Sequence, residues 1–80
     1  MSKKHFIKRH LLILERLRKN PCDFKELQEY VRKQFMYDDE DYELLIRTFE
    51  RDQKEILSIY GVEIRYIRKE KVYKIIELLT

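Results

Sequence analysis

The sequence predicts a small, mainly α-helical (α+β) domain in which three helices precede a two-stranded β-hairpin. The chain of 80 residues contains one Gly and one Pro, too few turn residues for a barrel or sandwich of short strands. Apolar residues recur at helical steps as far as Gly61, and the period changes to two after it. A chain of this length is expected to form one domain, residues 1–80, around one core.

The first helix is predicted from Phe6 to Arg18. Its apolar face is expected to comprise Ile7, Leu11, Leu14 and Leu17, with Phe6 and Ile13 beside them and with Arg9, Arg16 and Arg18 elsewhere. Pro21 ends this helix, because its ring disfavours helical geometry at Asn20 and it has no amide hydrogen to donate.

The second helix is predicted to begin at Asp23, whose carboxylate can cap the first turn, with Glu26 three residues further on. Its buried face is expected to comprise Leu27, Tyr30, Val31 and Phe35. The acidic run 38–41 supplies candidate N-caps for the third helix. Gly61 is the natural terminator of this helix. Before it, apolar residues follow one another at helical steps, namely Tyr42, Ile46, Phe49, Ile56 and Tyr60.

The hairpin is predicted because Val62, Ile64 and Tyr66 alternate with charged residues, and Tyr73 and Ile75 resume the alternation after residues 68–71. An isolated hairpin is marginally stable in water, so its apolar face should pack on the helices. This arrangement is a winged helix-turn-helix, with a recognition helix at about 45–60 and a wing at 62–76.

Charge is distributed unevenly along the chain. Residues 1–20 carry seven basic residues against one acid, residues 21–46 three against eight, and residues 47–80 eight against six, for a net charge of +3. Cys22 is the only cysteine, which excludes an internal disulfide, and no apolar run resembles a signal peptide or membrane span. We therefore expect a cytoplasmic protein without membrane partners, and the DNA contact predicted below would make it nucleoid-associated.

A basic stripe on the third helix predicts contact with double-stranded DNA. Arg47, Glu50, Arg51 and Lys54 follow at steps of three and four, opposite Ile46, Phe49 and Ile56. Arg47 or Arg51 could form a bidentate pair with guanine, whereas Thr48 and Lys54 suit phosphate. The alternative is that the stripe is only solvated surface.

The segment from Ile46 to Ile56, with its Arg47-Thr48 and Arg51-Asp52 pairs, resembles the recognition helix of DeoR-type and WYL-domain transcriptional regulators. The resemblance extends to 11–17, 23–27, 60–64 and 73–75. It implies a bacterial regulator that binds DNA as a homodimer through Arg47, Thr48 and Arg51, with Asp52 as a structural charge partner. Such regulators usually carry a ligand-sensing domain after the wing, so the chain is expected to be the N-terminal part of a longer regulator.

Three positions depart from that family. Leu45 stands where a Ser usually caps the recognition helix, so an alternative start lies upstream near Asp39, with an unbroken helix to Tyr60. Gln53 stands where the family usually has a Leu, in register with the core. A buried amide at this position needs hydrogen-bond partners, so Gln53 would either weaken the core or mark an interface. Val72 stands where the family often has Gly at the return of the wing.

Two further basic groups have alternative interpretations. Arg65, Arg68, Lys69 and Lys71 at the wing suit phosphate contact, but basic residues on an exposed edge also prevent aggregation. Lys3, Lys4, Lys8 and Arg9 could reach phosphate from the N-terminus, or could belong to a disordered start.

No enzymatic chemistry is predicted. His5 and His10 lie on different faces of a helix and Cys22 is alone, so no metal site or cofactor is expected, and the one Gly excludes a phosphate loop. No small-molecule site is expected in this chain. The predicted function is sequence-specific binding of double-stranded DNA by a transcriptional regulator. The alternative is a winged helix that binds a protein through exposed Leu44, Leu45 and Leu57.

Overall fold

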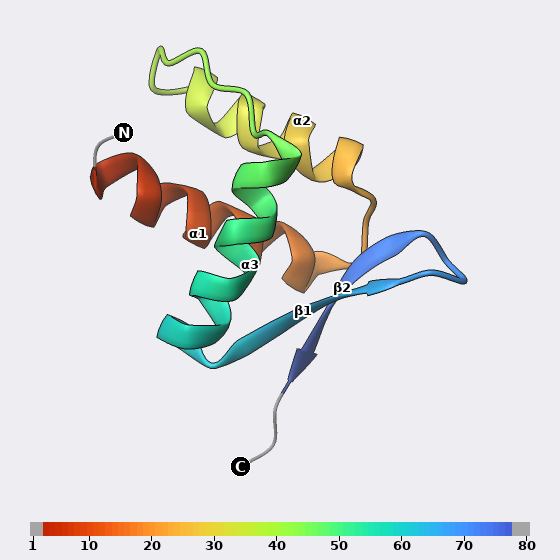
Figure 1. Cartoon of the computed structure of the whole chain (residues 1–80). Coiled ribbons are helices and arrows are strands. Elements are labelled where there is room, and N and C mark those ends of the chain that lie inside the picture. The colour runs from red at the N-terminus through yellow and green to blue at the C-terminus, as the bar shows by residue number, and fades with distance from the viewer. Residues whose placement is uncertain (1–2, 78–80) are drawn as a thin grey trace.

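The computed structural model describes residues 3–77, with side chains described from residue 5 to residue 76. Three helices precede a two-stranded antiparallel hairpin, as predicted (Figure 1). The elements are α1 (Lys3–Lys19), α2 (Phe24–Met36), α3 (Ile46–Tyr60), β1 (Val62–Ile67) and β2 (Val72–Glu77). Within residues 3–77, no helix is both long enough and apolar enough to span a bilayer.

The core lies where the three helices meet the inner face of the hairpin. It contains Ile13, Leu14, Leu17, Cys22, Leu27, Val31, Phe35, Leu44, Phe49, Ile56 and Ile64. Helix α1 packs against α2 and β2, and α3 packs against β1. In Figure 1, α3 crosses α1 and leads directly into β1, and the turn of the hairpin projects beyond the helices. The hairpin therefore completes the helical core while its tip stays in solvent.

Helix α1 buries only part of the predicted face: Leu14 and Leu17 are buried as predicted, with Ile13 beside them, but the first half of the helix differs. Ile7 and Leu11 are about half exposed, at 51% and 53%, whereas Arg9 and His10 are fully buried. The prediction for Ile7, Leu11 and Arg9 was wrong because it ranked residues by polarity alone. An ion pair with a residue of α3 places Arg9 in the interior. The helix also begins at Lys3, which contradicts a disordered start from that residue onward.

Helix α2 confirms the predicted cap. The Asp23 carboxylate accepts a hydrogen bond from the Glu26 amide at 2.8 Å. Leu27, Val31 and Phe35 are buried, whereas Tyr30 is only half buried. The Tyr30 hydroxyl donates to Glu15 on α1, and burial together with this hydrogen bond raises the pKa of Tyr30 to about 12.

The connection between α2 and α3 agrees with the recognition helix predicted at about 45–60 and contradicts the alternative start upstream. The helix begins at Ile46, with Leu45 in extended conformation before it, so neither an upstream start near Asp39 nor capping by the run 38–41 is observed. These acids instead attach the connection to α1, because Asp38 pairs with Lys8 and Glu40 with His5. At 37–45 the connection is longer than the turn of a minimal helix-turn-helix.

The segment before α2 extends the hairpin by one short bridge. The Cys22 amide donates to the Tyr73 carbonyl at 3.3 Å, and the Tyr73 amide returns a bond of 2.7 Å to Cys22. Within the hairpin, Ile64 faces Ile75 and Tyr66 faces Tyr73. The bridge covers part of the outer edge of β2 and fixes the hairpin against the start of α2.

Gly61 ends α3 in the left-handed conformation, with φ of +69°. A Cβ at this position would meet no atom within 4 Å, so Gly61→Ala would be strained by its backbone alone. We expect this substitution to lower the free energy of unfolding by about 1 kcal/mol. Urea denaturation measures this, with Ser58→Ala on exposed α3 surface as the neutral control. Equal stability of Gly61→Ala and the parent protein would contradict it.

Candidate nucleic-acid interface

Helix α3 presents a basic face to solvent. Arg47, Arg51 and Lys54 are exposed, and they follow one another at steps of four and three along the helix. Phe49, Asp52 and Ile56 are the buried residues of α3 and lie on its opposite side. The predicted stripe is therefore a continuous solvent-facing surface, and we call Arg47, Arg51 and Lys54 the basic face.

Two other predicted residues of α3 lie at the margins of the basic face. Thr48 is half buried, so its hydroxyl has less access to a ligand than the arginines have. Glu50 is exposed and lies close enough to β2 for its charge to act on Tyr73. Burial raises the pKa of the Tyr73 hydroxyl, and the Glu50 carboxylate raises it further. Glu50 therefore adds negative charge on the side of α3 that faces the hairpin.

Leu45 leaves the start of α3 uncapped. In the described part of the chain no side chain accepts a hydrogen bond at this N-cap, and the first turn of α3 contains no acid. The first amide groups of a helix lack partners within the helix and carry its positive dipole end. Because Leu45 and Arg47 are both exposed, the basic face begins at a helix end that itself favours anions.

The hairpin turn forms a second basic cluster. Arg68, Lys69 and Lys71 are all exposed, and we call these three residues the wing cluster. Lys71 has a positive φ of 58°, and its amide donates to the Ile67 carbonyl at 2.7 Å. The left-handed residue of the turn is thus Lys71, while Val72, which departs from the family pattern, is already the first residue of β2.

Arg65 differs from the wing cluster because it is held within β1. Its Nε and Nη2 atoms donate to one oxygen of Glu63, at 3.0 and 2.8 Å. In Figure 1 the hairpin turn projects away from α3. The predicted basic residues therefore form two separate groups, the basic face and the wing cluster. Arg65 lies on the strand between them, and its charge is offset by Glu63.

The predicted N-terminal phosphate contacts are not supported by the structure. Arg9 is buried. Lys8 pairs with Asp38, and its ammonium lies 4.3 Å from the centre of the Phe35 ring. The side chains of Lys3 and Lys4 lie outside the described residues. Arg9 and Lys8 instead form ion pairs within the fold, Arg9 with Asp52 and Lys8 with Asp38.

Gln53 has a partner that the sequence could not reveal. Its Nε2 atom donates to the Ile64 carbonyl of β1 at 3.2 Å. This bond gives the half-buried amide nitrogen an acceptor and fastens α3 to the hairpin. Gln53 therefore connects the helix that carries the basic face to the strand that leads to the wing cluster.

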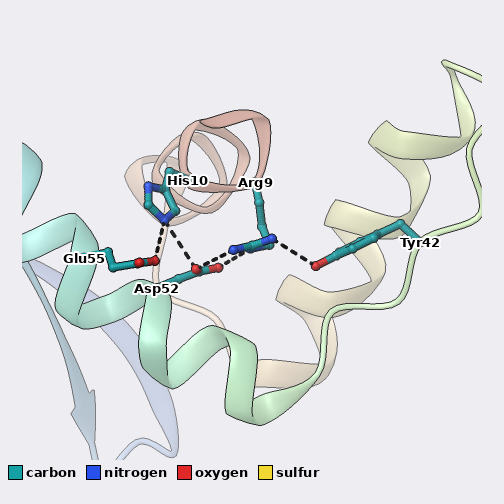
Figure 2. Close-up of polar contacts among 5 residues, drawn as sticks. All are labelled: Arg9, His10, Tyr42, Asp52 and Glu55. Atoms are coloured by element: carbon teal, nitrogen blue, oxygen red, sulfur yellow. Dashed lines mark hydrogen bonds and ion pairs between the residues drawn. The ribbon is translucent and has the colours of Figure 1, made fainter. Parts of the chain in front are cut away.

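A buried ion-pair network orients α3 against α1 (Figure 2). Asp52 is fully buried, and its two oxygens accept from Nε of Arg9 and, at 2.8 Å, from Nη2 of Arg9. His10 lies 3.3 Å from Asp52 on the same side, and Tyr42 accepts a longer bond of 3.4 Å from Arg9. The hydrogen bonds from Arg9 to Asp52 raise the pKa of Arg9, so the guanidinium remains charged.

This network confirms Asp52 as a structural charge partner, but sequence reasoning missed its partners. Arg9 and His10 occupy helical positions between Phe6 and Ile13, which is the only signal of burial that the sequence offers. The pairing joins residues 43 positions apart, which no local spacing can predict.

The apolar surface predicted to bind a protein in the alternative hypothesis is smaller than expected. Leu44 is fully buried, so its predicted exposure was wrong. The Leu44 carbonyl accepts a 2.8 Å bond from Gln28, which holds the residue against α2. Leu45 and Leu57 are exposed, at 54% and 42%, as expected.

Comparison of the chain with protein-family models, with curated proteins and with solved structures finds no match.

Proposed function

We propose that the chain is a sequence-specific double-stranded DNA-binding module of a transcriptional regulator. The observation that carries the proposal is the basic face of α3, which lies opposite the buried side of that helix. A helix with exposed arginines at its N-terminal half has the dimensions and donors to read base edges in a major groove. We assign this role to Arg47 and Arg51, and phosphate contact to Lys54 and Thr48.

The uncapped start of α3 supports the same assignment. Its free amide groups and dipole favour a phosphate beside Arg47. The buried Arg9–Asp52 pair and the Gln53 bond hold α3 against α1 and β1, so the basic face has a fixed orientation. A fixed orientation is what direct readout of bases requires, because bidentate pairs tolerate little misplacement.

The wing cluster would contact the backbone next to the groove. Arg68 and Lys69 occupy an exposed turn that projects beyond the helices, where they can follow phosphates without reading bases. Counterion release makes such contacts strongly dependent on salt. The wing cluster would therefore contribute affinity, and the basic face specificity.

The experiment that tests this proposal is selection from a random-sequence duplex pool, followed by fluorescence anisotropy on the selected duplex. We expect selection of a shared motif, and affinity for it at least about a thousandfold above that for unrelated duplexes. An inverted repeat would indicate binding as a homodimer on paired half-sites. Absence of binding at low salt would contradict the proposal and favour a protein partner on the exposed Leu45 and Leu57.

Neutralising the wing cluster tests its separate role. We expect Arg68→Gln with Lys69→Gln to weaken binding to all duplexes alike, because phosphate contacts carry no sequence information. The slope of log K against log salt should become shallower by about 0.9 for each phosphate that the variant no longer neutralises. Glu70→Gln in the same turn is the matched control and should not make the slope shallower. A changed sequence preference with an unchanged slope would contradict the assignment.

A further inference from the structure

Three metal-ligating side chains of α1 and α3 converge in the interior. The Nε2 atom of His10 and one carboxylate oxygen each of Asp52 and Glu55 lie within 4.8 Å of one another. His10 and Asp52 are fully buried, whereas the Glu55 side chain is one-third exposed. Figure 2 shows the imidazole pointing toward both carboxylates. Two of the three side chains are thus fully buried, and the Glu55 oxygen that faces His10 is itself a buried atom.

The distances suit a shared cation better than a shared proton. His10 Nε2 lies 3.3 Å from Asp52 Oδ1 and 3.4 Å from Glu55 Oε1. Both are long for a hydrogen bond, and one ring N–H could serve the two oxygens only through a weaker, bifurcated bond. Ligand atoms about 2.0–2.1 Å from a tetrahedral Zn²⁺ ion lie about 3.3–3.4 Å from each other. The spacing of the imidazole to each carboxylate therefore matches two edges of such a tetrahedron.

An unsatisfied oxygen points to the same conclusion. Glu55 Oε1 is a buried atom with no hydrogen-bond partner among the described residues. Arg9 binds both oxygens of Asp52 and offsets that charge, which leaves the charge of Glu55. With a neutral imidazole, the group of three side chains therefore has one negative charge more than Arg9 compensates. Burial of such a charge is costly unless it is compensated, and a divalent ion would replace the one excess negative charge by one excess positive charge.

Aromatic rings hold the imidazole in place. The Phe6 ring centre lies 4.2 Å from that of His10, and the Tyr60 ring meets the imidazole edge-on at 5.9 Å. His10 Nδ1 has no hydrogen-bond partner among the described residues, so the ring packing alone orients the imidazole, without the second-shell hydrogen bond that a metal-ligating histidine usually makes. Apolar surroundings of this kind limit solvent access and strengthen interactions with an ion.

We propose that His10, Asp52 and Glu55 bind a divalent transition-metal ion, with Zn²⁺ as the best fit. One nitrogen and two carboxylate oxygens are ligands that zinc accepts. The ion would link α1 to α3 directly. It would stabilise the folded chain by binding there, and this site does not depend on DNA binding.

Thermal unfolding of the whole chain with added Zn²⁺, after treatment with a chelator, tests the proposal. We expect Tm to rise by on the order of 10 °C when free Zn²⁺ is a hundredfold above the dissociation constant. Mg²⁺ at the same concentration should have little effect, because it rarely accepts an imidazole ligand. Substitution with Co²⁺ should give the visible absorption of a low-coordinate cobalt site.

Variants identify the ligands. Glu55→Gln should fold, because Glu55 is partly exposed, and should weaken Co²⁺ binding by at least about tenfold. His10→Gln should abolish the visible absorption, while His5→Gln on the same helix should leave it unchanged. An unchanged Tm with Zn²⁺, an equal rise with Mg²⁺, or loss of Co²⁺ binding in His5→Gln but not in His10→Gln would overturn the proposal.

Discussion

Replacing Asp52 with Ala is expected to lower the free energy of unfolding by about 3–5 kcal/mol, the usual cost of removing one partner of a buried ion pair. The loss is large because Arg9 is fully buried and would keep its charge without its partner. Small domains have a total stability of about 5–15 kcal/mol, so this variant should be close to unfolding at physiological temperature. Urea denaturation followed by circular dichroism measures the difference.

Two controls separate the ion pair from a general effect of charge. Asp41→Ala removes an exposed acid of the connection before α3 and should change stability by less than about 0.5 kcal/mol. The double variant Arg9→Met with Asp52→Leu replaces the pair by apolar groups and should recover much of the loss. If Asp52→Ala were as stable as Asp41→Ala, the pair would not hold α3 on α1.

Replacing Arg47 and Arg51 together with Ala is expected to reduce affinity for the selected duplex by about a hundredfold or more. Each bidentate contact with a base contributes about 1–3 kcal/mol to discrimination, and a factor of ten corresponds to about 1.4 kcal/mol. Both side chains are exposed, so Tm should remain close to that of the parent protein. Anisotropy titrations against the selected and unrelated duplexes measure the change in affinity and in specificity.

The matched control removes the same charge from exposed arginines elsewhere. Arg18→Ala with Arg32→Ala changes α1 and α2 and should reduce affinity far less, through weaker long-range attraction only. Equal losses in the two double variants would mean that net charge, and not the basic face, determines binding. That result would contradict the assignment of Arg47 and Arg51.

Local rules predicted most of the fold because the relevant signals are close together in the sequence. Asp23 capped α2, Gly61 ended α3, and the change of period at Val62 marked the hairpin. These features depend on contacts within a few residues, which spacing and residue type reveal. The same is true of the basic face, since steps of three and four placed its members on one side of the helix before any tertiary contact was known.

Features that depend on distant partners were not predicted. The burial of Arg9 and His10 requires Asp52 of α3, and the position of Gln53 requires a carbonyl of β1. The acidic run 38–41 looked like a set of helix caps because the partners of Asp38 and Glu40 belong to the start of α1, far away in the sequence. Arg9 and the acidic run were assigned to a surface or a cap because their partners lay far away in the chain, whereas Gln53 was placed in register with the core but its partner could not be identified.

The most direct test of the central claim is an amide chemical-shift titration of the ¹⁵N-labelled chain with the selected duplex. DNA contact by the basic face and the wing cluster predicts that the largest shifts fall on residues 46–54 and 68–71, with small shifts on α2. Saturating shifts confined to Leu57, Ile7 and Leu11, or no shifts at low salt, would contradict the claim that α3 binds DNA.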